Sequence, residues 1–102
     1  MSRYQPLRNA LREAVLSAPG ALDRAGREAI MNGQPLEGAL GAYVATVREH
    51  AWRVTDEQVA ALSASGVSDD EIFEATVSAA LGASLLRLER AQAALEATDA
   101  AS

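Results

Sequence analysis

The sequence predicts an all-α fold, a compact bundle of about five helices, and three observations support this prediction. Only four of the 102 residues are aromatic, whereas alanine is abundant, a composition that favours closely packed helices over a β-rich core. Apolar residues recur every three or four positions in successive segments. Two segments, TDEQ and SDDE, carry the signature of a capped helix start. The length predicts a single domain over residues 1–102.

Three helices are expected in the first half of the chain. The first ends before Pro19-Gly20, the second ends at Asn32-Gly33, and the third follows Pro35. Each carries an apolar stripe at helical spacing, which we expect to face the core. The stripes consist of Leu7, Ala10, Leu11, Ala14 and Val15; of Leu22, Ala25, Ala29 and Ile30; and of Leu36, Leu40, Tyr43, Val44, Val47 and Ala51.

Two capping boxes predict the starts of the last two helices. Thr55 is followed three residues later by Gln58, which predicts a short helix from about residue 56 to residue 65. Ser68 is followed by Glu71 in the same way, which predicts a long helix from residue 69. Val54 and Val67 precede the caps and are placed to pack onto the first turn that follows. The tail, residues 97–102, is expected to fray.

The long helix predicts self-association. Residues 75–86 carry no charge on any face, and a helix that is apolar all round must be buried all round. At about 1.5 Å per residue this helix reaches roughly 40 Å, which four short helices can hardly cover. A homo-oligomer supplies the missing cover, and the alternative is a monomer built around a central helix.

Composition excludes several classes of function. The chain has no cysteine, so disulfides, thiol catalysis and thiolate metal sites are excluded. The net charge of −5 argues against nucleic acid and against anionic membranes as partners. The longest uncharged run, ATVSAALGASLL, is too short to span a bilayer, and no signal-peptide pattern opens the chain, so a cytoplasmic protein is expected. We expect no cofactor and no metal.

The segment HAWRVTDEQVAALSASGVSDDEIFEATVSAALGASLLRLERAQAAL resembles the alkylhydroperoxidase D-like (AhpD-like) and carboxymuconolactone decarboxylase superfamily. The resemblance rests on the short capped helix ending in SASG, on the helix start VSDDEIFEATVSAALGA and on the amphipathic finish LLRLERAQAAL, and it is strongest over residues 43–95. It implies a compact all-α domain that forms homo-oligomers, often trimers or hexamers.

The resemblance also implies where chemistry resides in the family. The peroxidase branch has a Cys-x-x-Cys pair and a histidine four residues further on, at positions that match Ala51, Val54 and Gln58. Without the thiol pair, disulfide exchange and peroxide reduction cannot proceed. The decarboxylase branch has a histidine where this chain has Gln58, and glutamine cannot transfer a proton near neutral pH. We therefore expect structural roles for Val54 and Gln58.

Five residues remain as candidates for a site. His50, the only histidine, lies at the edge of the third stripe beside Tyr43, and it is either a general base or a structural residue. Trp52 and Arg53 either line a ligand pocket or anchor a subunit contact, where both residue types are enriched. Arg48 or Arg53 is a candidate for holding a carboxylate.

The sequence therefore leaves two hypotheses. The first is a small homo-oligomeric binding or assembly module of the AhpD-like type without thiol peroxidase activity. The alternative is a carboxymuconolactone decarboxylase-like enzyme that acts on a small organic acid or lactone by acid–base chemistry through His50. A polar cleft that brings His50 and an arginine together favours the enzyme, whereas a dry, packed junction favours the module.

Overall fold

The computed structural model describes residues 4–101, and these residues form helices joined by short loops, with no strand. The all-α class is confirmed. The elements are α1 (Gln5–Ser17), α2 (Arg24–Met31), α3 (Gly38–His50), the 3-10 turn η1 (Ala51–Arg53), α4 (Asp56–Ala64) and α5 (Asp69–Ala101).

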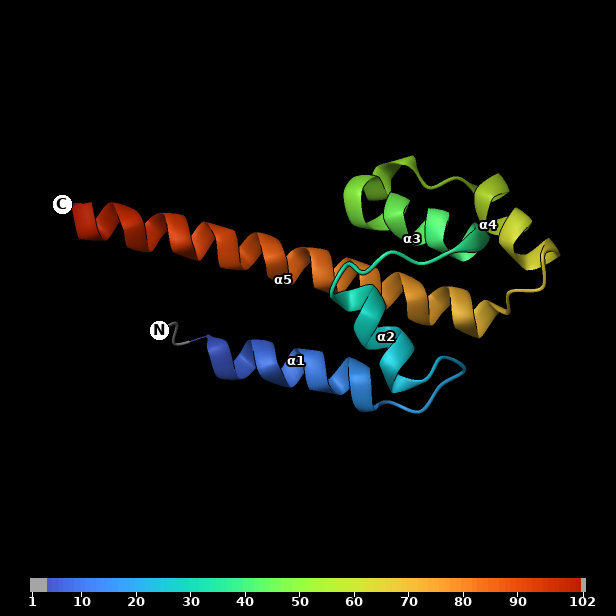
Figure 1. Cartoon of the computed structure of the whole chain (residues 1–102), viewed down its shortest axis with the longest axis horizontal. Helices are drawn as coiled ribbons and strands as arrows, with labels where there is room; N and C mark the ends of the chain where they lie inside the picture. The colour runs from blue at the N-terminus through green and yellow to red at the C-terminus, as the bar shows by residue number, and fades with distance from the viewer. Residues whose placement is uncertain (1–3, 102) are drawn as a thin grey trace.

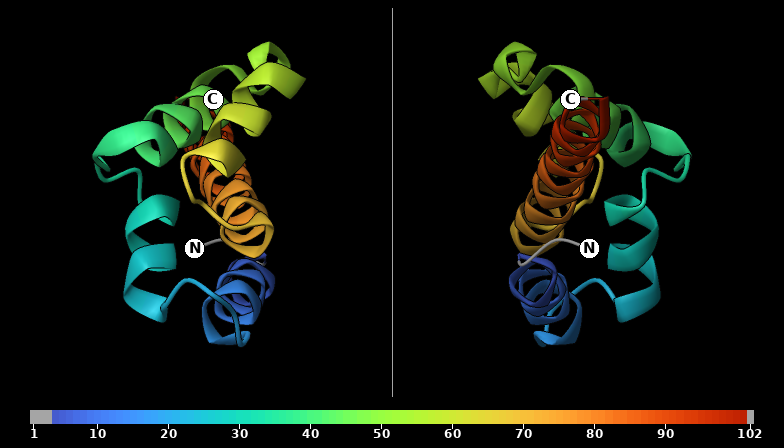
Figure 2. Two further views of the ribbon diagram at one scale, coloured as in Figure 1. Left: turned by 90° about the vertical axis from the view of Figure 1, so that its right-hand side faces the viewer. Right: turned by 90° about the vertical axis from the view of Figure 1, so that its left-hand side faces the viewer.

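The long helix α5 is the axis of the molecule (Figure 1). Helix α1 runs antiparallel beside α5, α2 crosses it on a second side, and α3 and α4 lie on a third side. Seen along α5, these helices surround three sides of it and leave the fourth side uncovered (Figure 2). The molecule is elongated, with extents of 55 × 28 × 19 Å. Its radius of gyration of 15.6 Å exceeds the roughly 13 Å expected for a compact domain of this length.

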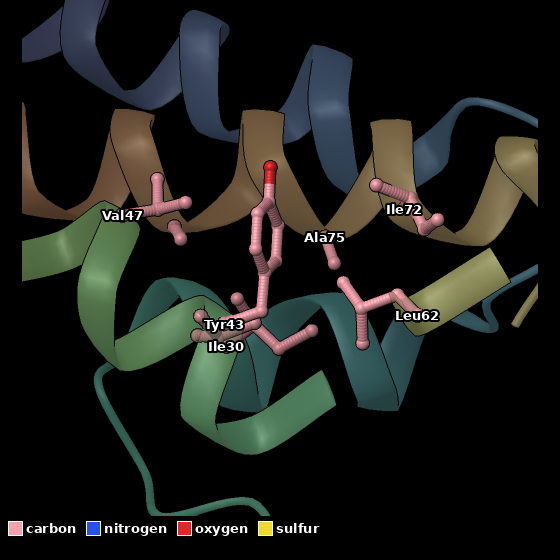
Figure 3. Packing of buried hydrophobic residues seen from close by; sticks show 8 residues of the cluster. Ile30, Tyr43, Val47, Leu62, Ile72 and Ala75 are labelled. Atoms are coloured by element: carbon pink, nitrogen blue, oxygen red, sulfur yellow. The ribbon is translucent and has the colours of Figure 1, made fainter. Parts of the chain in front are cut away.

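The core lies between α5 and the layer formed by α2, α3 and α4 (Figure 3). The ring of Tyr43 points from α3 toward α5, and its hydroxyl shares a hydrogen bond of 2.7 Å with Thr76 Oγ1. The third predicted stripe is therefore a core stripe through Tyr43, Val44 and Val47, although both of its ends, Leu36 and Ala51, are exposed. The core cluster consists of Ile30, Tyr43, Val44, Val47, Leu62, Ile72, Ala75 and Ala79.

A glycine sets the distance between α2 and α5. A Cβ atom added at Gly82 would lie 2.1 Å from the carbonyl oxygen of Met31, at the last residue of α2. Only a residue without a Cβ allows this approach. Gly82 thereby brings the end of α2 onto α5 and buries Ile30 and Met31.

One predicted capping box forms completely and the other forms in half. Glu71 N donates to Ser68 Oγ and Ser68 N donates to Glu71 Oε1, both at 3.1 Å. Thr55 Oγ1 accepts from Gln58 N at 3.2 Å. The reciprocal contact of that box was predicted wrongly, because the side-chain amide of Gln58 points to Thr46 Oγ1 at 3.5 Å.

Helix α5 differs from the prediction at its end and along one side. It continues through residues 97–101, where we expected fraying, because alanine is the strongest helix former; Ser102 lies outside the described residues. Residues 75–86 are not buried all round within one chain. Ala75, Ser78 and Ala79 are buried, whereas Ala80 and Ser84 on the opposite side are exposed. Among residues 4–101, no helix is long and apolar enough to cross a membrane.

Candidate functional site

The residues predicted around His50 lie on an exposed turn. His50 ends α3, and Trp52 and Arg53 follow it on η1. All three are exposed, and Trp52 retains 76% of its surface. The imidazole meets the edge of the indole with ring centroids 5.7 Å apart, and the guanidinium of Arg53 lies 4.8 Å from the indole centroid. The three side chains form a cluster on the outside of the protein.

Tyr43 and Arg48 lie apart from this cluster. Tyr43 is buried and bonded to Thr76. Arg48 Nη1 donates to the carbonyl oxygens of Met31 at 3.1 Å and Ile30 at 3.4 Å. Met31 O is one of the carbonyls that the C-terminus of a helix leaves unpaired, where a positive charge is also favourable, whereas Ile30 O also accepts from Gly33 N at 3.1 Å. Arg48 therefore ties α3 to the end of α2.

The three positions that match the catalytic residues of the AhpD-like superfamily carry no group that could perform acid–base or redox chemistry. Ala51 is exposed, Val54 is half-buried against the core, and Gln58 is half-buried between α4 and α3. Within the part of the chain that the structure describes, no three His, Asp or Glu side chains gather as a metal site.

The clearest departure from expectation is the orientation of α1. Its apolar stripe was predicted to face the core, and this is wrong for Leu7, Ala10, Leu11 and Ala14, which are all exposed. Leu7 retains 59% of its surface. The helix instead buries Leu16 together with Arg8, which is only 7% exposed. Most of the apolar side of α1 faces solvent.

The buried side chain of Arg8 lacks part of its hydrogen bonding. Its Nη2 donates to Gln5 Oε1, but Nε and Nη1 have no hydrogen-bond partner. A buried donor without a partner costs about 1–3 kcal/mol, and more when the group is charged. Helix α1 therefore holds an unfavourable polar contact while its apolar side is uncovered.

Helix α5 carries a second outward stripe. Phe73 retains 68% of its surface, and Leu88 and Leu95 are exposed too. Between them lie half-buried Val77 and Leu81 and exposed Ala80, Ser84 and Ala91. These positions recur every three or four residues and so share one side of the helix, opposite the core. This set is the outer stripe of α5.

The two stripes meet on one side of the molecule. A hollow of about 480 Å³ is lined by Ala14 and Val15 of α1, by Ala18 after it, and by Phe73 and Val77 of α5, with Arg27, Asp70 and Glu74 also at its wall. We call the combined surface, formed by Leu7, Leu11 and Ala14 with the outer stripe of α5, the α1/α5 face. Figure 2 shows that the other helices leave one side of α5 uncovered, and the outer stripe consists of exposed and half-buried positions of that helix. Sequence reasoning identified its α1 half but assigned it to the core, and it missed the spacing of Phe73, Val77, Leu81, Leu88 and Leu95.

A carboxylate positions α1 and α2 relative to α5. Glu74 of α5 accepts hydrogen bonds from Leu22 N and Ala21 N, both at 2.9 Å, in the loop between the two helices. The amides of Leu22 and Ala21, with a smaller contribution from Arg27, lower the pKa of Glu74 below its ordinary value. The folded chain therefore stabilises the ionised carboxylate of Glu74 more than the unfolded chain does.

This contact predicts a pH dependence of stability. Because the pKa of Glu74 is lowered on folding, its contribution is complete above the unfolded pKa of about 4.3 and is lost as the pH falls through the folded pKa. Glu74→Gln should lower the melting temperature at neutral pH, and the difference from wild type should shrink as the pH falls through the lowered pKa of Glu74. Glu49→Gln, at an exposed position, should have little effect. An equal difference at every pH would contradict the assignment.

Comparison of the chain with protein families, with curated proteins and with solved structures yields no match. The resemblance to the AhpD-like superfamily stays a prediction. The candidate site therefore rests on the geometry of the α1/α5 face.

Proposed function

We propose that the protein is a small helical assembly module that forms homo-oligomers through the α1/α5 face, and that it is a variant of the AhpD-like type without thiol chemistry. This proposal rests on the way α1 packs, with its apolar side exposed and Arg8 buried. An amphipathic helix that exposes its apolar side and buries an arginine is unfavourable in an isolated chain. It becomes favourable when a partner covers the apolar side.

The size and continuity of the surface support the same proposal. Single exposed apolar side chains are common on soluble proteins, but a contiguous patch shared by two neighbouring helices marks an interaction site. Phe73, Leu7 and Leu11 lie on this patch, and each retains close to half of its surface or more. Burial of one such side chain stabilises an interface by roughly 1.5–3 kcal/mol.

The arrangement around His50 favours the module over the enzyme. In the decarboxylase-like hypothesis His50 shares a cleft with an arginine that holds a carboxylate. Arg48 is instead bonded to the end of α2, and Arg53 stacks on Trp52 at an exposed turn. The absence of cysteine independently removes thiol peroxidase chemistry.

Light scattering of the wild-type protein over a concentration series tests the proposal. The chain has a mass of 10.7 kDa. We expect a discrete multiple of this mass at micromolar concentration, with dissociation only on strong dilution. A mass of one chain throughout the micromolar range would contradict self-assembly.

A further inference from the structure

We propose that a second copy of this chain covers the α1/α5 face, with the two α5 helices antiparallel about a two-fold axis that passes between Ala80 and Leu81. This inference rests on the proposed function and adds the orientation and the register of the contact. Two properties of the outer stripe of α5 lead to it, its spacing and its dimensions, and the helix dipole supports the orientation.

The part of the outer stripe from Phe73 to Leu88 has the same spacing read in either direction. Positions 73, 77 and 80 mirror positions 88, 84 and 81 about a point between residues 80 and 81. A two-fold contact requires such self-complementarity, because the same surface serves on both copies. An antiparallel pair in this register sets Phe73 on Leu88 of the partner subunit. The small residues Ala80 and Ser84 at the centre allow the two helices to approach closely.

The helix dipoles favour the antiparallel arrangement, because it sets the N-terminal part of each α5 beside the C-terminal part of the other. The charged side chains of α5 do not decide the orientation. Arg87 donates to Arg48 O at 3.2 Å and lines a hollow on the α3 side together with Arg90. Asp69 and Asp70 begin the helix, and Glu96 and Asp99 lie near its other end.

The dimensions suit a second copy of the same chain. Between Phe73 and Leu88, the positions that pair in this register, the stripe is about 22 Å long, and α1 adds about 20 Å beside it, each about 10 Å wide. The projected face is therefore on the order of 400 Å² per copy, which places the contact at the small end of specific interfaces. Two such faces form a bundle of four helices, two from each copy.

This contact restricts the symmetry of the assembly. A two-fold interface produces a dimer, and it also occurs in a hexamer with dihedral symmetry. A simple trimer has no two-fold axis. Of the trimer and hexamer that the family resemblance implies, only the hexamer is compatible with the proposed register.

The absence of cysteine allows a direct test, because a single introduced thiol has no competitor. Ala80 and Ala91 are both exposed alanines on the outer stripe, and so Ala80→Cys and Ala91→Cys form a matched pair. In the proposed register residue 80 lies beside its own counterpart, whereas the two copies of residue 91 are roughly 30 Å apart. A disulfide requires Cα atoms within about 7 Å.

Each variant is oxidised mildly as the folded protein, and the cross-linked dimer is measured by non-reducing electrophoresis. The same variants unfolded in denaturant supply the rate of random collision. We expect Ala80→Cys to cross-link at least about tenfold faster than Ala91→Cys. Equal cross-linking at both positions would indicate a parallel contact and overturn the register. Cross-linking at neither, in a protein that light scattering shows to be oligomeric, would overturn the two-fold contact but leave the proposed function standing.

Discussion

Gly82→Ala is expected to destabilise the protein by about 3 kcal/mol or more, at the upper end of the cost of overpacking a core. A change from glycine to alanine within a helix usually stabilises a protein, because alanine is favoured there by about 1 kcal/mol, but here we expect the opposite. The reason is steric. The new Cβ would lie 2.1 Å from Met31 O and 2.8 Å from Met31 C, and backbone atoms cannot rotate away. Helix α2 must move, and its contacts with α5 and with Arg48 are lost.

Urea unfolding of Gly82→Ala and wild type measures this effect. Ala60→Gly, at an exposed position within α4, reports the intrinsic difference between alanine and glycine in a helix of this protein. The control should be destabilised by about 1 kcal/mol. If Gly82→Ala were instead stabilised by a similar amount, the end of α2 could not lie on α5 at this glycine.

Phe73→Lys is expected to dissociate the homo-oligomer. Of the exposed side chains on the α1/α5 face, that of Phe73 is the largest. Its removal costs roughly 1.5–3 kcal/mol of burial in each copy, so a two-fold contact loses about 3–6 kcal/mol. That loss weakens the dissociation constant by about 10² to 10⁴-fold, before the cost of burying the ammonium group is added.

The same substitution should leave the single chain folded. Asp69 and Asp70 precede position 73 by four and three residues, so a lysine there gains attractive neighbours on the helix surface. Sedimentation equilibrium measures the dissociation constant, and circular dichroism measures the helix content. Ala60→Lys places the same charge on an exposed helical site away from the face and should assemble like wild type. Equal dissociation constants for the two variants would remove Phe73 from the interface.

Local signals in the sequence determined much of the fold. The start of α5 follows from Ser68 and Glu71, because a capping box depends on residues three apart. The core stripe through Tyr43, Val44 and Val47 follows from helical spacing alone. The side-chain contact of Gln58 could not be predicted in this way, because Thr46, with which it bonds, belongs to another helix.

The candidate site could be predicted only in part for a related reason. Helical spacing shows which residues share a side of α1, but it does not show which side packs on α5. Arg27 and Arg48 illustrate the difficulty, since charged residues are expected in solvent. Arg27 Nη1 donates to Val15 O at 2.7 Å, and Arg48 bonds to Met31 O, so each arginine binds a carbonyl near the end of a helix. These contacts depend on tertiary packing, which spacing along the chain does not contain.

Small-angle X-ray scattering of the wild-type protein tests self-assembly through the α1/α5 face most directly, because it yields mass and length together. One chain is 55 Å long and has a mass of 10.7 kDa. Side-by-side antiparallel pairing about residues 80 and 81 predicts twice that mass per pair, with a longest dimension of only about 60 Å for the pair. A particle of 10.7 kDa and 55 Å at micromolar concentration would contradict the proposal.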